Sequence, residues 1–180
     1  MPAKLIRPSI TYKASLLEAL REGYTHGVEK PRSEDDIQEI ENNFDDFIAN
    51  ASKVDAEGQI KCPDGKTYDR VPSTSYWLVL DDTFIGGIAV RHHLNDFLIQ
   101  YGGHIGYGVR PNFRKQGYGT LMLRLCLAEA RKLVDDRVLI TCSDSNTGSR
   151  KIIESNGGIL ENIAHYDWME GGTMRFWIEF

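Results

Sequence analysis

The residues best suited to chemistry lie in a glycine-rich turn that joins an apolar segment to an amphipathic one. Arg114 and Lys115 precede Gly117 and Gly119, and helical spacing of apolar side chains begins after Thr120. Backbone N–H groups in the first turn of a helix lack intrahelical partners and carry the positive end of the helix dipole. Glycine adds no Cβ, so a ligand can approach these N–H groups closely. The turn is therefore a candidate diphosphate site.

The glycine spacing excludes two common phosphate-binding loops. The turn lacks the Gly-Lys-Ser/Thr sequence that closes a mononucleotide P-loop. The dinucleotide fingerprint requires a third glycine three residues after Gly-x-Gly. Pro111 stands at that position after Gly106-x-Gly108. Met122 stands there after Gly117-x-Gly119.

The remaining pattern, Arg114-x-x-Gly117-x-Gly119 after Val109-Arg110-Pro111, resembles the acyl-CoA pyrophosphate loop of the GNAT N-acetyltransferase superfamily. The resemblance spans nearly the whole chain and is closest over residues 86–158. Three segments are also similar to a branch of uncharacterised bacterial predicted acetyltransferases: Arg91-His92-His93-Leu94, Gly102-Gly103-His104-Ile105-Gly106-Tyr107 and Asn156-Gly157-Gly158. The resemblance implies an acetyl-CoA-dependent N-acetyltransferase.

The elements that position the turn follow from apolar spacing and turn signals. The chain is expected to form strands over 4–10, 75–80, 84–90, 101–109 and 137–142, helices over 16–24, 37–48, 121–133 and 147–156, and a closing hairpin over 159–168 and 173–180. This order resembles that of the GNAT fold. It implies an α/β (α+β) fold with a mixed, mostly antiparallel central sheet flanked by helices, in a single domain over residues 1–180. The polar segment 51–72 is expected to form a small hairpin or to cover a substrate site.

Composition limits the class of protein. A chain of 180 residues can bury a sizeable core, and its net charge of −5 disfavours a nucleic-acid partner. No apolar run reaches the roughly 20 residues of a membrane span, and the N-terminus does not resemble a signal peptide, so we expect a cytoplasmic protein. The three cysteines lack metal-ligand spacing, and Cys126 and Cys142 are expected to be reduced core residues. We expect no metal.

The resemblance implies where the co-substrate acetyl-CoA binds. Its pantetheine arm would lie between the strand that carries the turn and the next strand, with bonds to backbone groups of Tyr107 and Val109. Amides of the turn would hold the pyrophosphate, and the two cations would add charge. The implied acetyl-CoA-binding residues are Tyr107, Val109, Arg114, Lys115, Gln116, Gly117, Tyr118, Gly119, Thr120, Asn146, Ser149 and Lys151.

A second implied element follows the strand that ends at Cys142. In the family an asparagine at this place meets the pantetheine arm, and Asn146 stands there in this chain. Ser149 and Lys151 would lie near the nucleotide end. A helix cap formed by Asn146 or Thr147 explains the same residues equally well, and the two roles are compatible.

Acyl transfer to an amine requires a neutral amine, so a base must remove a proton near neutral pH. His104 is the first candidate base, because strand alternation places it on the same face as Gly106 and Gly108, beside uncrowded space. A hydrogen-bonded structural histidine explains His104 at least as well. His92 and His93 are alternatives. A strand N–H near Tyr107 could stabilise the oxyanion.

The proton donor for the departing thiolate is open. Many family members carry a tyrosine in the final helix, but Ile153 stands at the matching position and cannot donate a proton. Tyr107, Tyr166 or water could serve instead, or the thiolate could leave unaided. Asp144 could also reach the thioester.

The sequence favours an enzyme that transfers acetyl from acetyl-CoA to a primary amine by direct attack. The alternative is a non-catalytic acyl-CoA-binding sensor or interaction module, which the missing tyrosine favours. A third possibility is an interaction protein whose turn binds nothing. The acidic balance suggests a cationic small-molecule or peptide amine as acceptor, and a homodimer is common in the family.

Overall fold

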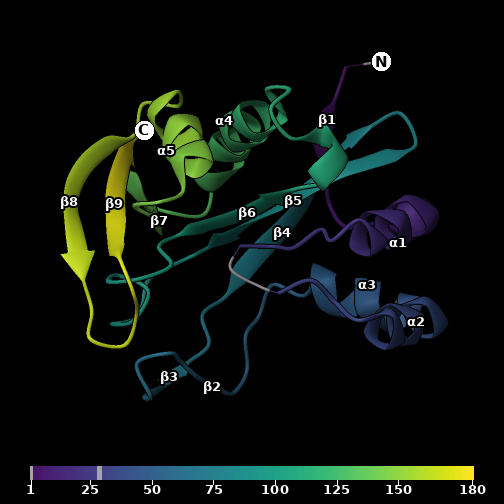
Figure 1. The fold of residues 1–180 in the computed structure, drawn as a ribbon, viewed down its shortest axis with the longest axis horizontal. Helices are drawn as coiled ribbons and strands as arrows, with labels where there is room; N and C mark the ends of the chain where they lie inside the picture. Colours follow the sequence, from purple (N-terminus) through teal and green to yellow (C-terminus); the bar gives the residue numbers. More distant parts are fainter. Residues whose placement is uncertain (1, 28–29) are drawn as a thin grey trace.

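Two antiparallel sheets meet edge to edge at the centre of the molecule (Figure 1). The computed structural model describes residues 2–27 and 30–180. The larger sheet has the order β1-β4-β5-β6, formed by β1 (Lys4–Ile6), β4 (Ser73–Leu80), β5 (Thr83–Arg91) and β6 (Ile105–Val109). The smaller sheet has the order β7-β9-β8, formed by β7 (Arg137–Ser143), β9 (Gly172–Glu179) and β8 (Ile159–His165).

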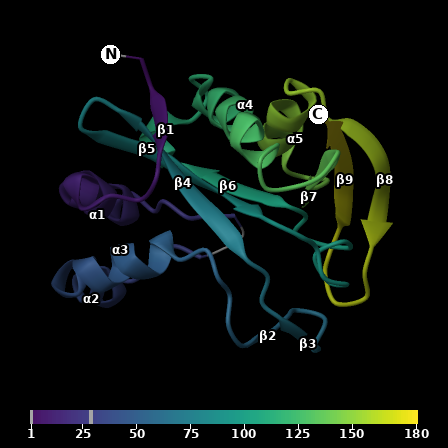
Figure 2. The same cartoon turned by 180° about the vertical axis from the view of Figure 1, so that it is seen from behind.

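Helices cover both faces of the larger sheet (Figures 1 and 2). One face carries α4 (Tyr118–Ala130) and α5 (Thr147–Glu154), and the other carries α1 (Lys13–Arg21), α2 (Glu34–Asn42) and α3 (Phe44–Ser52). The short 3-10 helices η1 (Ile10–Tyr12) and η2 (Pro111–Phe113) precede α1 and α4. The expected α/β fold with a mostly antiparallel central sheet flanked by helices is confirmed, although the ladders of the described residues are all antiparallel and lie in two main sheets.

Each helical layer has its own apolar core. On one face, buried residues of α4, α5 and both sheets, including Met122, Leu123 and Ile153, form the larger cluster. On the other, α1, α2 and α3 pack against Trp77 and Phe84 of the sheet. β4 and β5, whose side chains enter both clusters, thus separate two independently packed sides.

Several boundaries differ from the sequence expectation. The first strand ends at Ile6, and the helix expected over 37–48 breaks at Asn43, whose φ of −117° and ψ of 38° are not helical. The strand expected from residue 101 begins at Ile105. Gly102 and Gly103 precede it with φ values of 104° and 61°, which the extended backbone of a strand does not allow.

Segment 51–72 forms the expected small hairpin, with β2 (Gln59–Lys61) paired to β3 (Thr67–Asp69). Its aromatic ring at Tyr68 packs 5.5 Å from the ring of Phe97, and Asn95 Nδ2 donates to Asp69 O at 3.0 Å. The hairpin therefore packs against the segment that leads from β5 to β6.

Two of the three cysteines were expected to be reduced core residues, and both are buried. Cys126 and Cys142 are buried free thiols, and Cys62 is half-buried. Burial raises the pKa of Cys126 to about 12. Within residues 2–27 and 30–180, no helix is long and apolar enough to span a membrane, and no three His, Cys, Asp or Glu side chains gather as metal ligands.

Candidate active site

Strands β6 and β7 are joined at one end and diverge toward the other. His104 N donates to Leu139 O at 2.7 Å, and Leu139 N donates to His104 Nδ1 at 2.9 Å. Over the described residues, no ladder pairs the rest of β6 with β7. Beyond His104, the edge of β6 that faces β7 therefore has no strand partner among the described residues, and we call the space along this edge the opening between the sheets.

The register with β5 decides which backbone groups of β6 face this opening. Arg110 N donates to Ile85 O at 2.8 Å, so the even-numbered residues of this segment bond to β5. Because the bonding direction alternates in a strand, Tyr107 and Val109 direct their N–H and C=O groups away from β5. Gly27 N donates to the Tyr107 carbonyl at 3.3 Å. In the described part of the chain, neither amide has a hydrogen-bond acceptor.

The glycine turn places uncapped amides at the start of α4. Gly117 is the N-cap residue and has no side chain to bond the first helical turn, which contains no acidic residue. The turn amides from Tyr118 to Thr120 therefore lack both a helical acceptor and a side-chain cap. Arg114 and Lys115 are exposed beside them. The site combines backbone donors, a helix dipole and two cations.

The two glycines of the turn serve different physical needs. Gly117 has a φ of 84°, and a Cβ there would meet nothing within 4 Å. Gly119 is packed, because a Cβ there would lie 2.5 Å from Ile152 Cδ1. The first glycine permits the left-handed backbone beside open space, and the second lets α4 approach α5.

Side chains of the turn also stabilise its shape. Arg114 Nε donates to Val109 O at 3.0 Å, and Gln116 Nε2 donates to Asn112 O at 2.9 Å. Lys115 has a φ of 59°, a backbone conformation that residues other than glycine rarely adopt. Gln116 thus supports the loop through its side chain, and only its amide remains a candidate ligand donor.

Tyr107 connects β6 to α5 across the opening. Its hydroxyl lies 2.8 Å from Ser149 Oγ, and burial raises its pKa well above the ordinary value. Asn146 Oδ1 accepts from Ser149 N at 3.0 Å, which confirms the helix-cap role for Asn146. Lys151 is exposed on α5. The second implied element therefore does border the strand that carries the turn.

His104 has the structural role that the sequence left open. Its ring is 7% exposed, and Nδ1 accepts the Leu139 N–H bond that joins the two sheets. Burial, with the charge of Arg91 nearby, lowers its pKa to about 4. An imidazole whose Nδ1 accepts this bond carries its proton on Nε2, so neither nitrogen offers a lone pair to an amine. The geometry does not favour His104 as the base.

A histidine that the sequence reasoning missed, His26, lies over the glycine face of β6. A Cβ at Gly106 would lie 3.8 Å from His26 Nε2 and 4.0 Å from both Nη atoms of Arg91. A Cβ at Gly108 would collide with Thr25 O, 2.0 Å away. The segment before residue 28 thus rests directly on β6. The adjacent glycines signalled the open face, but nothing local in the sequence indicated what covers it.

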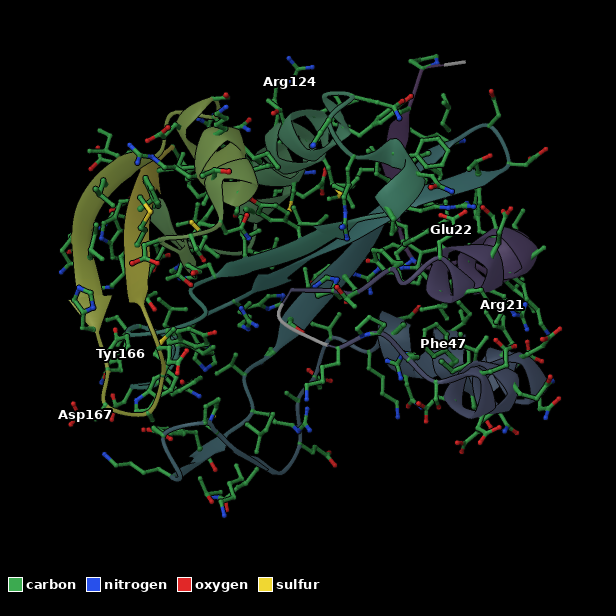
Figure 3. All side chains as sticks on the ribbon, in the orientation of Figure 1. Arg21, Glu22, Phe47, Arg124, Tyr166 and Asp167 are labelled. Carbon is green, nitrogen blue, oxygen red and sulfur yellow. The ribbon has the colours of Figure 1, made fainter. Side chains whose placement is uncertain are left out.

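A buried ion pair holds this segment in place. Arg110 is 3% exposed, and its Nη2 and Nε bond the Glu22 carboxylate at 2.6 and 2.8 Å. Glu18 contributes a second carboxylate at 2.7 Å. Glu22 ends α1 on the side that faces β6 and η2 (Figure 3). Arg110 therefore ties the last turn of α1, and the segment that leads to His26, to the end of β6.

A cavity of about 200 Å³ adjoins this segment on the same side of the sheet. Its apolar wall includes Leu20, Phe47 and Trp77, and Gly87 of β5 borders it. Polar and charged lining comes from Tyr24, His26, Lys30, Arg32 and Ser75. The cavity therefore combines an apolar wall with polar and cationic groups beside the segment that covers β6.

The other sequence candidates lie in structural positions. His92 Nε2 lies 2.8 Å from Thr74 Oγ1, and Asp144 Oδ2 accepts from Gly172 N at 2.8 Å. Tyr166 lies at the tip of the β8–β9 hairpin, where its hydroxyl donates to Gln100 O at 2.7 Å (Figure 3). His93 is exposed, and Ile153 is fully buried in the larger core. These positions leave Tyr107 as the candidate proton donor at the opening.

Comparisons with known proteins agree with this arrangement. Residues 26–159 match the acetyltransferase (GNAT) domain family. A search of curated proteins found no match.

Solved structures with a similar fold include three acetyltransferases. One from Salmonella typhimurium modifies the N-terminal serine of a 50S ribosomal subunit protein, with 14% identity, a TM-score of 0.60, and 99% of this chain and 95% of that chain covered. The microcin C7 self-immunity acetyltransferase, in complex with acetyl-CoA and AMP, has 14% identity and a TM-score of 0.60, covering 99% and 92%. An aminoglycoside acetyltransferase in complex with coenzyme A has 14% identity and a TM-score of 0.61, covering 99% and 95%.

Identities this low show a shared fold. The family match covers most of the chain. The chain therefore belongs to the GNAT family of acetyltransferases, enzymes whose acyl donor is acetyl-CoA.

Proposed function

We propose that this protein transfers the acetyl group of acetyl-CoA to a primary amine by direct attack. The observation that carries the proposal is the position of β6. One edge presents the amides of Tyr107 and Val109 to the opening beside the uncapped turn of α4. One face presents Gly106 to His26 and the cavity side. A thioester bound along the edge would thus meet an amine that arrives over the face.

The donor site consists mainly of backbone groups. The amides of Tyr107 and Val109 would bond the pantetheine arm, and those of Gln116, Gly117, Tyr118, Gly119 and Thr120 would bond the pyrophosphate. Arg114, Lys115 and Lys151 add positive charge. Asn146 and Ser149 border the arm from α5. Backbone donors that need no reorganisation suit a site that holds an acyl donor in one position.

Proton transfers are assigned to opposite sides of β6. His26 lies over Gly106 and is the group we assign to accept the proton of the attacking amine. Tyr107 keeps its proton at neutral pH, because burial raises the pKa of its hydroxyl. That proton can pass to the departing sulfur, with Ser149, 2.8 Å away, as the hydrogen-bonded neighbour that orients the hydroxyl.

Calorimetry of acetyl-CoA binding tests the donor site. Gly117→Asp places a carboxylate where the pyrophosphate would bind, in space that is otherwise open. Gly117→Asn is the matched control, since it has nearly the same size and backbone strain without the charge. We expect micromolar binding by the wild type, weaker binding by Gly117→Asn and none by Gly117→Asp. No binding by the wild type would overturn the proposal.

Turnover separates the enzyme from a binding module. We expect release of free CoA thiol from acetyl-CoA when a panel of primary amines is added. Tight acetyl-CoA binding without acetyl transfer to any amine, and without slow hydrolysis, would instead support the non-catalytic alternative.

A further inference from the structure

Arg91 is a half-buried cation without a carboxylate partner among the described residues. It is the last residue of β5, and its side chain lies on the face that carries Gly106. Nη1 donates to the carbonyls of Gly102 and Gly103 at 3.2 and 2.9 Å. Burial lowers its pKa from the ordinary arginine value. The guanidinium thus has backbone acceptors on one side, and within residues 2–27 and 30–180 no carboxylate pairs with it.

The contrast with other arginines in the chain is clear. Arg110 is more buried than Arg91, and two carboxylates neutralise it. Arg175 is also partly buried and pairs with Glu161 at 3.0 Å. Burying a charge without a partner costs free energy, so an anion bound beside Arg91 would be stabilised there. A planar guanidinium suits carboxylate or phosphate oxygens in particular.

The surroundings of Arg91 add positive charge and no described acid. The described residues that line the adjoining cavity include His26, Lys30 and Arg32, and none is Asp or Glu. Burial, together with the charge of Arg91 and with His93, lowers the pKa of His104 to about 4, so His104 stays neutral and does not neutralise Arg91. The acidic residues of the 51–72 segment lie in the β2–β3 hairpin and its flanks, outside the lining of this cavity. The local field therefore favours an anion, although the whole chain is acidic.

We propose that the acetyl acceptor is a small primary amine that also carries a carboxylate or phosphate within a few bonds of the amine, and that Arg91 binds this acidic group. This inference rests on the proposed function. Both Nη atoms of Arg91 and Nε2 of His26 lie within 4.0 Å of the same point above Gly106. An acid held by Arg91 therefore leaves its amine beside His26 and the thioester only if few bonds separate the two groups. The apolar wall of the cavity can hold the rest of the molecule.

Calorimetry on the protein saturated with CoA tests this without requiring turnover. The probes are matched pairs that differ in the acidic group: phenylalanine against phenethylamine, and phosphoethanolamine against ethanolamine. Spermidine serves as the polycationic probe. We expect the acidic member of at least one pair to bind about tenfold or more tightly than its partner, as a charge-assisted bond predicts. The pair that shows the difference identifies carboxylate or phosphate.

Three variants locate the effect. Arg91→Gln should abolish the preference for the acidic member of each pair. Arg91→Lys keeps the positive charge and should retain part of that preference. Arg124→Gln is the matched control, because Arg124 is exposed on α4 and points away from the sheet (Figure 3). It should keep the wild-type preference.

Equal binding within both pairs, binding of spermidine alone, no binding of any probe, or a preference that survives in Arg91→Gln would each overturn the assignment. Acetyl-CoA titrations of the same variants keep the two proposals separate. Absence of acetyl-CoA binding by the wild-type protein would instead contradict the proposed function.

Discussion

The two sides of β6 offer different kinds of group to a ligand: backbone amides on one side and side chains on the other. On the proposed donor side, backbone amides of β6 and of the α4 N-terminus would do most of the binding, and the side chains of Arg114 and Gln116 hydrogen-bond within the loop and hold its shape. On the other side, bare glycines leave room for His26 and Arg91. Backbone amides suit a ligand that is the same across a family, because substitutions of side chains leave the amides in place. Side chains can be exchanged without disturbing the fold, so the acceptor specificity of such a protein can change while its donor site persists.

The largest effect on stability is expected from adding a methyl group to β6 at Gly108, where the segment that carries His26 packs on the strand. In Gly108→Ala, the new Cβ would lie 2.0 Å from Thr25 O, so the segment that carries His26 must move. We expect a loss of about 3 kcal/mol in the free energy of unfolding, as overpacking against backbone predicts. Urea titration measures it.

Gly106→Ala is the control for Gly108→Ala, since its Cβ would meet nothing closer than 3.8 Å. It should fold normally and raise the KM for the amine. Equal stability losses in the two alanine variants would contradict the packing of residues 24–27 on β6.

Removing the proton acceptor should affect chemistry and leave donor binding intact. His26→Gln is expected to lower kcat by about 100-fold, the usual contribution of a general base. The dissociation constant for acetyl-CoA should stay within about twofold of the wild type, because a lost contact there would cost more. Tyr107→Phe should lower kcat less for activated acyl donors with better leaving groups. A His26→Gln variant with normal kcat would remove His26 from the proposal.

The joint between the sheets should make stability depend on pH. The pKa of His104 is lowered to about 4, so above the unfolded value of about 6.5 both states hold a neutral ring and the contribution is complete. As pH falls from 6.5 toward 4, the unfolded state binds the proton first, and up to about 3 kcal/mol of stability is lost.

His104→Asn isolates this contribution, because an amide oxygen can still accept the Leu139 N–H bond but does not titrate. Urea unfolding at a series of pH values should show a flatter profile for His104→Asn than for the wild type. Parallel profiles would show that His104 does not carry the pH dependence.

The smallest effect is expected from the cap on the donor side. Asn146→Ala removes the acceptor for Ser149 N and should cost about 1 kcal/mol of stability. Asn146→Asp, which keeps the acceptor, is the control. Because Ser149 orients the Tyr107 hydroxyl, Asn146→Ala should also lower kcat slightly, and an unchanged kcat would show that the cap and the hydroxyl are independent.

The sequence predicted the fold of the proposed donor side well, because that segment is local; the binding roles of its residues stay predictions. Residues 105–120 form strand, turn and helix in one segment, and glycine spacing and helix periodicity act over that length. The acceptor side joins residues 26, 91 and 106, which only the tertiary fold brings together. His104 shows the same limit, since strand alternation predicted its face but not that Leu139 N would bond its ring. The break at Asn43 was missed because the apolar spacing continues across it.

The reactivity of the buried Cys126 thiol can report how often the core around α4 becomes exposed to solvent. This thiol lies on the buried face of α4 and has a pKa of about 12, so it reacts with an alkylating reagent only when the core is exposed. Its labelling rate in the native state therefore measures how often the helix behind the glycine turn separates from the sheets. Acetyl-CoA, if it bridges β6 and α4 as proposed, would slow that labelling, so donor binding could be followed by mass spectrometry without a known acceptor.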